Sequence, residues 1–181
     1  MSLSREDRAT LLRIARAVIE ACARGERCPG FDVKSPPLLQ KQGAFVTIHK
    51  DGHLRGCIGT FTSEKPLYMT VMEMAEASAM KDPRFPPLGA DELNSIDIEI
   101  SVLSPLREVK DVSEIEVGRH GIYIIKGFNS GVLLPQVAVE YGYDRETFLD
   151  QTCLKAGLPP GAWREGARIL IYEAEIIKEK E

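Results

Sequence analysis

Arg55 and Cys57 are the residues of this chain whose types and spacing point most directly to chemistry. They lie two positions apart in a run of strand-forming residues, and alternate residues of a strand point to the same side of the sheet. A fixed positive charge stabilises the thiolate, which is the nucleophilic form of cysteine. Gly56 and Gly59 interrupt the strand, and glycine there marks a bulge or the close approach of a backbone or a ligand. The pattern predicts a reactive thiol; the alternative is a small buried core residue.

A β-hairpin must position this pair. Asp51-Gly52 lies between two runs of strand-forming residues, and this dipeptide favours a two-residue type I′ turn, which needs positive φ at both central residues. With such a turn, the register places Val46 opposite Cys57. The same count places Ile48 opposite Arg55.

The rest of the chain predicts an α+β fold with a largely antiparallel sheet, because hairpins dominate and no repeated strand–helix–strand unit occurs. The clearest strand is the alternating run 96–103. Residues 121–134 indicate a second hairpin, and 168–177 a last strand. Helices are expected between Ser4 and Gly25, from Pro66 to about Lys81, from Pro135, and after Asp144.

A proline-braced loop, Asp82-Pro83-Arg84-Phe85-Pro86-Pro87, follows the second predicted helix. Stiff loops hold functional groups with little entropy to lose on binding, so Asp82 and Arg84 are candidate substrate contacts. The alternative is a connector in which Phe85 fills the core and Asp82 pairs locally. Farther along the chain, Gln136 and Glu140 lie one helical turn apart and share a side, which faces either a cleft or water.

The hexapeptide Leu54-Arg55-Gly56-Cys57-Ile58-Gly59 resembles the signature of the AMMECR-one domain family, the protein of the AMME syndrome candidate region and its microbial relatives. Later stretches resemble further family motifs in the same order: Asp82-Pro83-Arg84-Phe85, His120-Gly121-Ile122, Leu134-Pro135-Gln136-Val137-Ala138, Lys155-Ala156-Gly157 and Trp163. The resemblance covers nearly the whole chain. It implies one domain over residues 1–181 with two lobes, the larger holding both termini, and a cleft between them.

Two functions of different classes fit these residues. In the first, the protein is an enzyme that uses Cys57 as nucleophile and His120 as general base. Glu140 is an alternative base, which would need a pKa raised by burial. Arg55 or Arg84 would hold an anionic group of the substrate with two hydrogen bonds.

In the second, the protein is a non-catalytic binding or adaptor domain in which Gly56, Gly59 and Arg55 shape a recognition groove. Arg55 would then act as a brace, paired with a carboxylate such as Asp82 or Glu99. The resemblance implies a setting for either function, because microbial relatives occur fused to, or encoded with, a Memo-like protein and a radical-SAM protein. Any radical chemistry would belong to that partner, since the sequence has no iron–sulfur or nucleotide motif and its cofactor is unknown.

Composition argues against several other classes. A net charge of −4 and a pI of about 5.5 argue against nucleic acid as a partner. No run approaches the roughly 18 apolar residues of a membrane span, and no signal-peptide pattern is present. Four cysteines without a CxxC pair indicate no zinc ribbon or disulfide framework, so we expect a cytoplasmic protein with reduced thiols. His49 and His53 fall on opposite faces of the predicted hairpin, so no metal site is expected.

Overall fold

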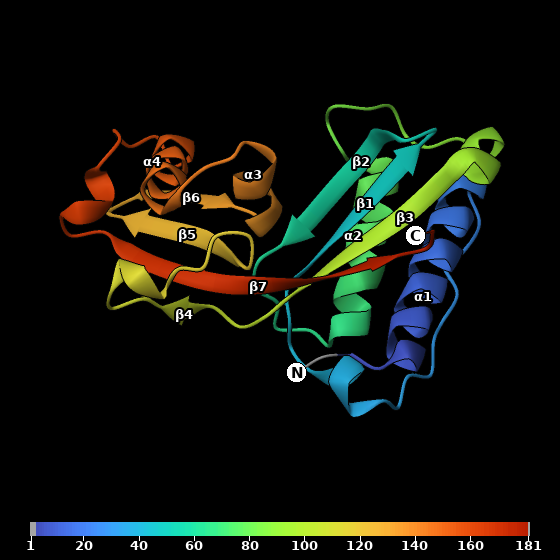
Figure 1. Cartoon of the computed structure of the whole chain (residues 1–181). Coiled ribbons are helices and arrows are strands. Elements are labelled where there is room, and N and C mark those ends of the chain that lie inside the picture. The colour runs from blue at the N-terminus through green and yellow to red at the C-terminus, as the bar shows by residue number, and fades with distance from the viewer. Residues whose placement is uncertain (1–2, 181) are drawn as a thin grey trace. The chain divides into compact units, whose positions relative to one another are not determined.

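The structure is a computed structural model that describes residues 3–180 (Figure 1). The chain divides into two compact units. The first comprises the chain up to Leu103 together with the segment from Glu175, and the second is Ser104–Ala174. The last strand, β7 (Arg168–Lys178), contributes residues to both units. Both units contain helices and antiparallel strands, so the predicted α+β class is confirmed.

The two helices of the first unit follow the predicted end signals. α1 (Arg5–Arg24) begins after Ser4, whose hydroxyl accepts a hydrogen bond from the N–H of Asp7 at 3.1 Å. It ends at Gly25, whose φ of 67° lies in the left-handed region that glycine adopts without steric cost. α2 (Leu67–Met80) begins directly after Pro66, one residue later than predicted.

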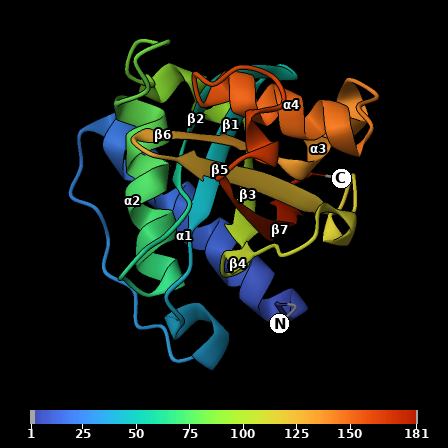
Figure 2. The same ribbon diagram turned by 90° about the vertical axis from the view of Figure 1, so that its left-hand side faces the viewer.

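The sheet of the first unit has β2 at an edge. β1 (Ala44–Lys50) lies between β2 (His53–Thr60) and β3 (Ile96–Leu103), all antiparallel, and the C-terminal part of β7 continues the sheet beyond β3. Alternate side chains of β1 are fully buried beneath the helices: Ala44, Val46 and Ile48. α1 and α2 lie side by side on this face (Figures 1 and 2). The opposite face of the sheet is therefore free of these helices.

The β1–β2 hairpin has the predicted turn. Asp51 and Gly52 adopt φ values of 51° and 78°, which is the positive pair that a type I′ turn needs. Lys50 pairs with His53 across it, as expected for a two-residue connection.

A β-bulge two residue pairs beyond the turn changes the predicted register. Ile48 pairs with Gly56, and Arg55 has no partner in the ladder. An extra residue on one strand moves every later pair by one position. Cys57 consequently faces Thr47, so the predicted pairings of Cys57 with Val46 and of Ile48 with Arg55 are wrong.

The second unit contains two helices and further antiparallel strands, which join the sheet through β7. β5 (His120–Lys126) and β6 (Asn129–Leu133) form the predicted second hairpin, and β5 also pairs with β7. β4 (Arg107–Glu108) pairs with β7 as well. α3 (Pro135–Glu140) and α4 (Arg145–Lys155) pack on this sheet over an apolar core that includes Ile122, Ile124, Phe148 and Leu149.

Short 3₁₀ helices connect these elements in the described part of the chain: η1 (Pro36–Leu39), η2 (Ala90–Ser95), η3 (Val112–Glu114) and η4 (Ala162–Arg164). Of these, η2 bears on the candidate site because it carries Glu92. No helix within residues 3–180 is both long and apolar enough to cross a membrane.

Candidate functional site

Gly56 allows helix α2 to lie directly against β2. A Cβ atom at this position would stand 2.2 Å from the backbone oxygen of Ser78, which is too close for any side chain. The buried Ser78 hydroxyl accepts a hydrogen bond from the N–H of Ile58 at 2.9 Å and donates one to the carbonyl of Val46 at 2.7 Å. Packing of α2 on β2 therefore requires glycine at position 56. The contacts of Gly56 and Ile58 with Ser78 hold the strand on either side of Cys57.

Two side chains of the loop after α2 hold the backbone of Cys57 at the sheet edge. The N–H of Cys57 donates to Asp82 Oδ2 at 2.9 Å, and its carbonyl accepts from Arg84 Nη2 at 3.2 Å. Arg84 also binds Asp82 through Nε and Nη2, at 3.0 and 2.7 Å. The Asp82–Arg84 pair thus satisfies backbone groups that an edge strand otherwise leaves open. These two predicted site residues lie beside Cys57, and a substrate contact by either stays a prediction.

The charges of this pair are stable over the ordinary pH range. Asp82 is only 4% exposed, yet hydrogen bonds from the Arg84 guanidinium, and then from the N–H of Cys57, hold its pKa well below the usual range. The hydrogen bond to Asp82 raises the pKa of Arg84. Because the Arg84 side chain is 53% exposed, it presents a permanent cation to solvent near the thiol.

Cys57 is half-buried. It pairs with Thr47, which lies between the inward-facing Val46 and Ile48, so its side chain is on the sheet face opposite the helices. Its Sγ is 3.2 Å from Thr47 Oγ1, across the strand pair. Thr47 pairs with Glu99 on β3, and Glu99 Oε2 is 3.3 Å from Lys178 Nζ on β7. These residues form a line of polar side chains across the four strands.

Arg55 is bound within the protein. Its Nε and Nη2 donate to the two carboxylate oxygens of Glu92 at 3.0 and 2.9 Å, and its Nη1 donates to the carbonyl of Pro86 at 3.0 Å. The side chains of Arg55 and Glu92 are 11% and 14% exposed. The Arg55 hydrogen bonds, with others from the N–H of Gly89 and from Lys50, lower the pKa of Glu92 to about 2. The structure thus shows Arg55 paired with Glu92. A substrate contact by Arg55 stays a prediction.

Phe85 and Gly59 complete the surroundings of the site. The Phe85 ring centroid is 5.9 Å from the Cζ of Arg55 and 5.6 Å from the Cζ of Arg84, which is within cation–π distance. A Cβ at position 59 would stand 2.2 Å from the ring of Phe45, so Gly59 makes room for that ring. A role for Gly56 or Gly59 in substrate binding stays a prediction.

His120, on β5, is 6% exposed and has a defined hydrogen-bond arrangement. Its Nδ1 accepts a hydrogen bond from the N–H of Glu116 at 3.0 Å, which assigns the proton of the neutral ring to Nε2. Nε2 lies 3.8 Å from Glu173 Oε1. A role as general base would require the ring to give up the bond to Glu116.

Gln136 and Glu140 lie on α3, where Gln136 is half-buried and Glu140 is exposed. Together with His120 they belong to the second unit, whereas Cys57 belongs to the first. Their meeting with Cys57 therefore stays a prediction, as does the cleft between two lobes.

The other three cysteines have different surroundings. Burial is the main cause that raises the pKa of each thiol. Cys22 is half-buried, Cys28 is exposed, and Cys153 is fully buried in the apolar core of the second unit. Within residues 3–180, no group of three or more His, Cys, Asp or Glu side chains is placed to hold a metal ion.

Three residues of the site escaped the sequence analysis: Thr47, Ser78 and Glu92. Thr47 would have followed from the bulge, which a glycine at position 56 can signal. Ser78 and Glu92 act through contacts that span 20 and 37 positions of the chain, for which no local pattern exists.

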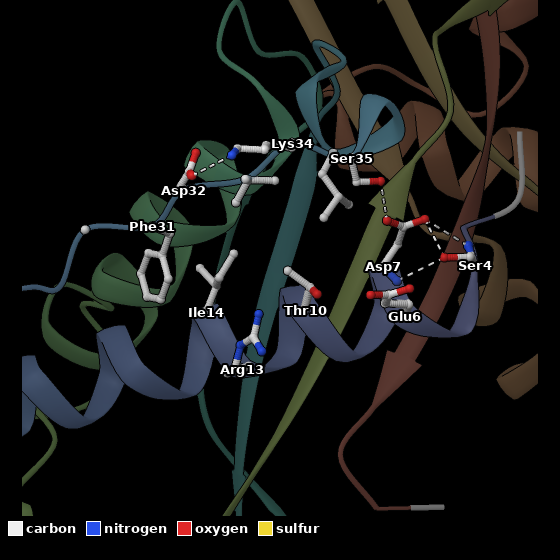
Figure 3. Close-up of a pocket in the computed structure, with 13 residues that line it drawn as sticks. Ser4, Glu6, Asp7, Thr10, Arg13, Ile14, Phe31, Asp32, Lys34 and Ser35 are labelled. Atoms are coloured by element: carbon white, nitrogen blue, oxygen red, sulfur yellow. Dashed lines mark hydrogen bonds and ion pairs between the residues drawn. The ribbon is translucent and has the colours of Figure 1, made fainter.

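A hollow of about 500 Å³ lies elsewhere in the first unit, between α1 and residues 30–35 (Figure 3). Some of its polar side chains bind one another. Ser35 Oγ donates to Asp7 Oδ1 at 2.5 Å, and Lys34 Nζ lies 3.3 Å from Asp32 Oδ2. Glu6, Thr10 and Arg13 also line the hollow.

Comparison with known proteins covers almost the whole chain. The AMMECR1 family model matches residues 12–177. Protein Mbar_A1807 of Methanosarcina barkeri is 43% identical over 94% of this chain and 89% of its own, and Protein MJ0810 of Methanocaldococcus jannaschii is 43% identical over 99% and 93%. The crystal structure of the uncharacterized protein PH0010 from Pyrococcus horikoshii matches with a TM-score of 0.83 at 40% identity, covering 94% of this chain and 90% of that one. With sequence and fold matched over this extent, the chain belongs to the AMMECR1 family.

Proposed function

We propose that this protein is a cysteine-dependent component of a modification pathway, with Cys57 as its nucleophile. The observation that carries the proposal is the setting of the thiol. Cys57 is half-buried, its Sγ is 3.2 Å from the Thr47 hydroxyl, and the cationic Arg84 binds the carbonyl of the same residue. A cysteine that serves only packing lies among apolar side chains, as Cys153 does.

The substrate that suits this setting carries an anionic group near an electrophilic atom. Arg84 is the better placed of the two candidate arginines, because Arg55 directs its donors to Glu92 and Pro86. Among the described residues, none accepts a hydrogen bond from Arg84 Nη1, and the side chain is half-exposed. A planar guanidinium favours carboxylate or phosphate groups as partners.

Attack by the sulfur forms a bond to the electrophilic atom and requires that the thiol proton leave. His120 and Glu140 are the proposed acceptors of that proton. For Glu140 to serve, its surroundings in the working protein would have to raise its pKa toward the operating pH.

The pathway itself is proposed from the family resemblance. Microbial relatives accompany a Memo-like and a radical-SAM protein, so we propose these two as partners in the cytoplasm, where thiols stay reduced. A pull-down from cells that encode both partners should recover at least one of them with this protein. Recovery of neither would remove the support for this setting.

A non-catalytic binding domain is the second candidate. It is favoured because several signature residues have structural contacts that explain their presence. Gly56 allows α2 to lie against β2, Gly59 makes room for the Phe45 ring, and Arg55 pairs with Glu92. In this role the domain would present a substrate or a partner to the two other proteins.

Competitive alkylation separates the two candidates. Iodoacetamide is added in limiting amount to the folded protein, and mass spectrometry of the cysteine peptides gives a rate for each thiol. Cys28 is the internal control, because it is more exposed than Cys57 and its pKa is raised by burial and by Glu76. We expect Cys57 to react faster at neutral pH despite its lower exposure. A rate no higher than that of Cys28 would remove the basis of the nucleophile and leave the binding domain.

A further inference from the structure

Thr47 is the side chain that contacts the Cys57 sulfur. The two residues lie directly opposite each other on β1 and β2, with Oγ1 and Sγ 3.2 Å apart. Val46 and Ile48, on either side of Thr47, are fully buried, which anchors this part of β1. A β-branched side chain also has few rotamers, so the hydroxyl is held near the sulfur.

We propose that Thr47 is a positioning residue for Cys57, whose hydroxyl donates a hydrogen bond to the sulfur, favours the thiolate and sets the direction of its remaining lone pairs. The inference rests on the proposed function of Cys57 as nucleophile. A thiol is a weak acceptor, whereas an anion accepts hydrogen bonds strongly. The same contact therefore stabilises the thiolate more than the thiol.

The charged side chains on the elements around Cys57 are paired with one another, whereas the Thr47 hydroxyl contacts the sulfur directly. The pairs are Asp82 with Arg84, Glu99 with Lys178, and Glu92 with Arg55 and Lys50, and His49 is the remaining titratable side chain nearby on β1. Each pair brings charges of both signs close together, which limits its net field at the sulfur.

The Thr47 contact acts on the sulfur itself and does not replace the group that accepts the thiol proton. His120 and Glu140 stay the proposed acceptors.

The test is the pH profile of Cys57 alkylation in single variants. Thr47→Val keeps the shape and the strand preference of the side chain and removes the donor. In the reaction, the thiolate forms a bond to the CH₂ carbon of iodoacetamide while the carbon–iodine bond breaks and iodide leaves. We expect the rate at neutral pH to fall about threefold to tenfold, as the loss of one hydrogen bond implies. The rate at strongly alkaline pH should stay unchanged, because every thiol is then ionised.

Two further variants serve as matched controls. Thr47→Ser restores a hydroxyl and should recover most of the neutral-pH rate. Thr62→Val makes the same substitution at an exposed position in the loop after β2 and should leave the profile unchanged. Melting temperatures confirm that each variant is folded.

An unchanged profile in Thr47→Val would overturn the inference, as would an equal loss at every pH, which a merely distorted strand produces. If Cys57 reacts no faster than Cys28 and Thr47→Val still shifts the profile, the proposed nucleophile fails while the Thr47 contact stands.

Discussion

Arg55→Ala should destabilise this protein strongly, because it leaves a nearly buried carboxylate without its main partner. Glu92 loses two hydrogen bonds, of 3.0 and 2.9 Å, and keeps those from Lys50 and from the N–H of Gly89. Removing one partner of a buried ion pair costs about 3–5 kcal/mol. The remaining contacts and the 14% exposure of Glu92 place our expectation at about 3 kcal/mol. For a chain of this length that lowers the melting temperature by about 6–12 °C.

The lowered pKa of Glu92 gives a second value, of the same order, for the stabilisation free energy of the ionised Glu92 side chain. Its pKa falls from 4.5 to about 2 in the folded protein, and at 1.36 kcal/mol for each unit this is about 3 kcal/mol. A carboxyl whose pKa is lowered by folding contributes stability that is fully present above its unfolded pKa. That stability is lost as the pH falls from about 4.5 through about 2. Arg55→Ala should therefore flatten the acid limb of the stability curve.

Thermal and denaturant unfolding, followed by circular dichroism, measure both effects. Arg168→Ala is the matched control, because Arg168 pairs with Glu108 at the surface with side chains 59% and 52% exposed; such pairs contribute about 0–1 kcal/mol. A double-mutant cycle with Glu92→Gln isolates the coupling. A melting temperature of Arg55→Ala close to that of the wild type, together with slower alkylation of Cys57, would refute this reasoning. Arg55 would then act on the thiol or a ligand.

Two further substitutions test the packing around Cys57. Gly56→Ala should lower the free energy of unfolding by about 1–3 kcal/mol or more, measured with denaturant, because its Cβ would stand 2.2 Å from the Ser78 carbonyl oxygen. Gly30→Ala is the control, because a Cβ there meets nothing within 4 Å. Equal stabilities of the two variants would contradict the contact. Asp82→Asn should cost about 1.5–3 kcal/mol at neutral pH, since a charge-assisted bond to Arg84 is lost. The lowered pKa of Asp82 means that this loss persists down to strongly acidic pH, and a variant as stable as the wild type would count against it.

Local signals in the sequence account for much of the first unit. The capping residues of α1, the Asp51-Gly52 turn and the alternating strand 96–103 each act through neighbours in the chain, and each is confirmed. The register of the hairpin was predicted wrongly because one residue, Arg55, is extruded from the ladder. Nothing in the turn itself encodes that bulge, although a glycine beside it is consistent with one.

Long-range contacts decide what the site residues do, and those contacts are not local patterns. In the alternative in which Arg55 is a structural brace, the sequence suggested a carboxylate such as Asp82 or Glu99 as its partner, whereas the partner is Glu92, 37 positions along the chain. Asp82 instead binds Arg84 and the backbone of Cys57. Sequence motifs thus named the candidate residues, whereas the packing of η2 and the loop after α2 on β2 determines which partners those residues have.

The most direct test of a reactive Cys57 compares its alkylation rate in the folded protein with its rate in the fully unfolded chain, at neutral pH and with the same reagent. Unfolding removes Thr47 and Arg84 from the sulfur and exposes it completely. If the folded setting favours the thiolate, the folded-state rate constant exceeds the unfolded one, whereas Cys28 and Cys153 react more slowly when folded. A folded-state rate constant for Cys57 at or below that of the unfolded chain would contradict the proposed nucleophile.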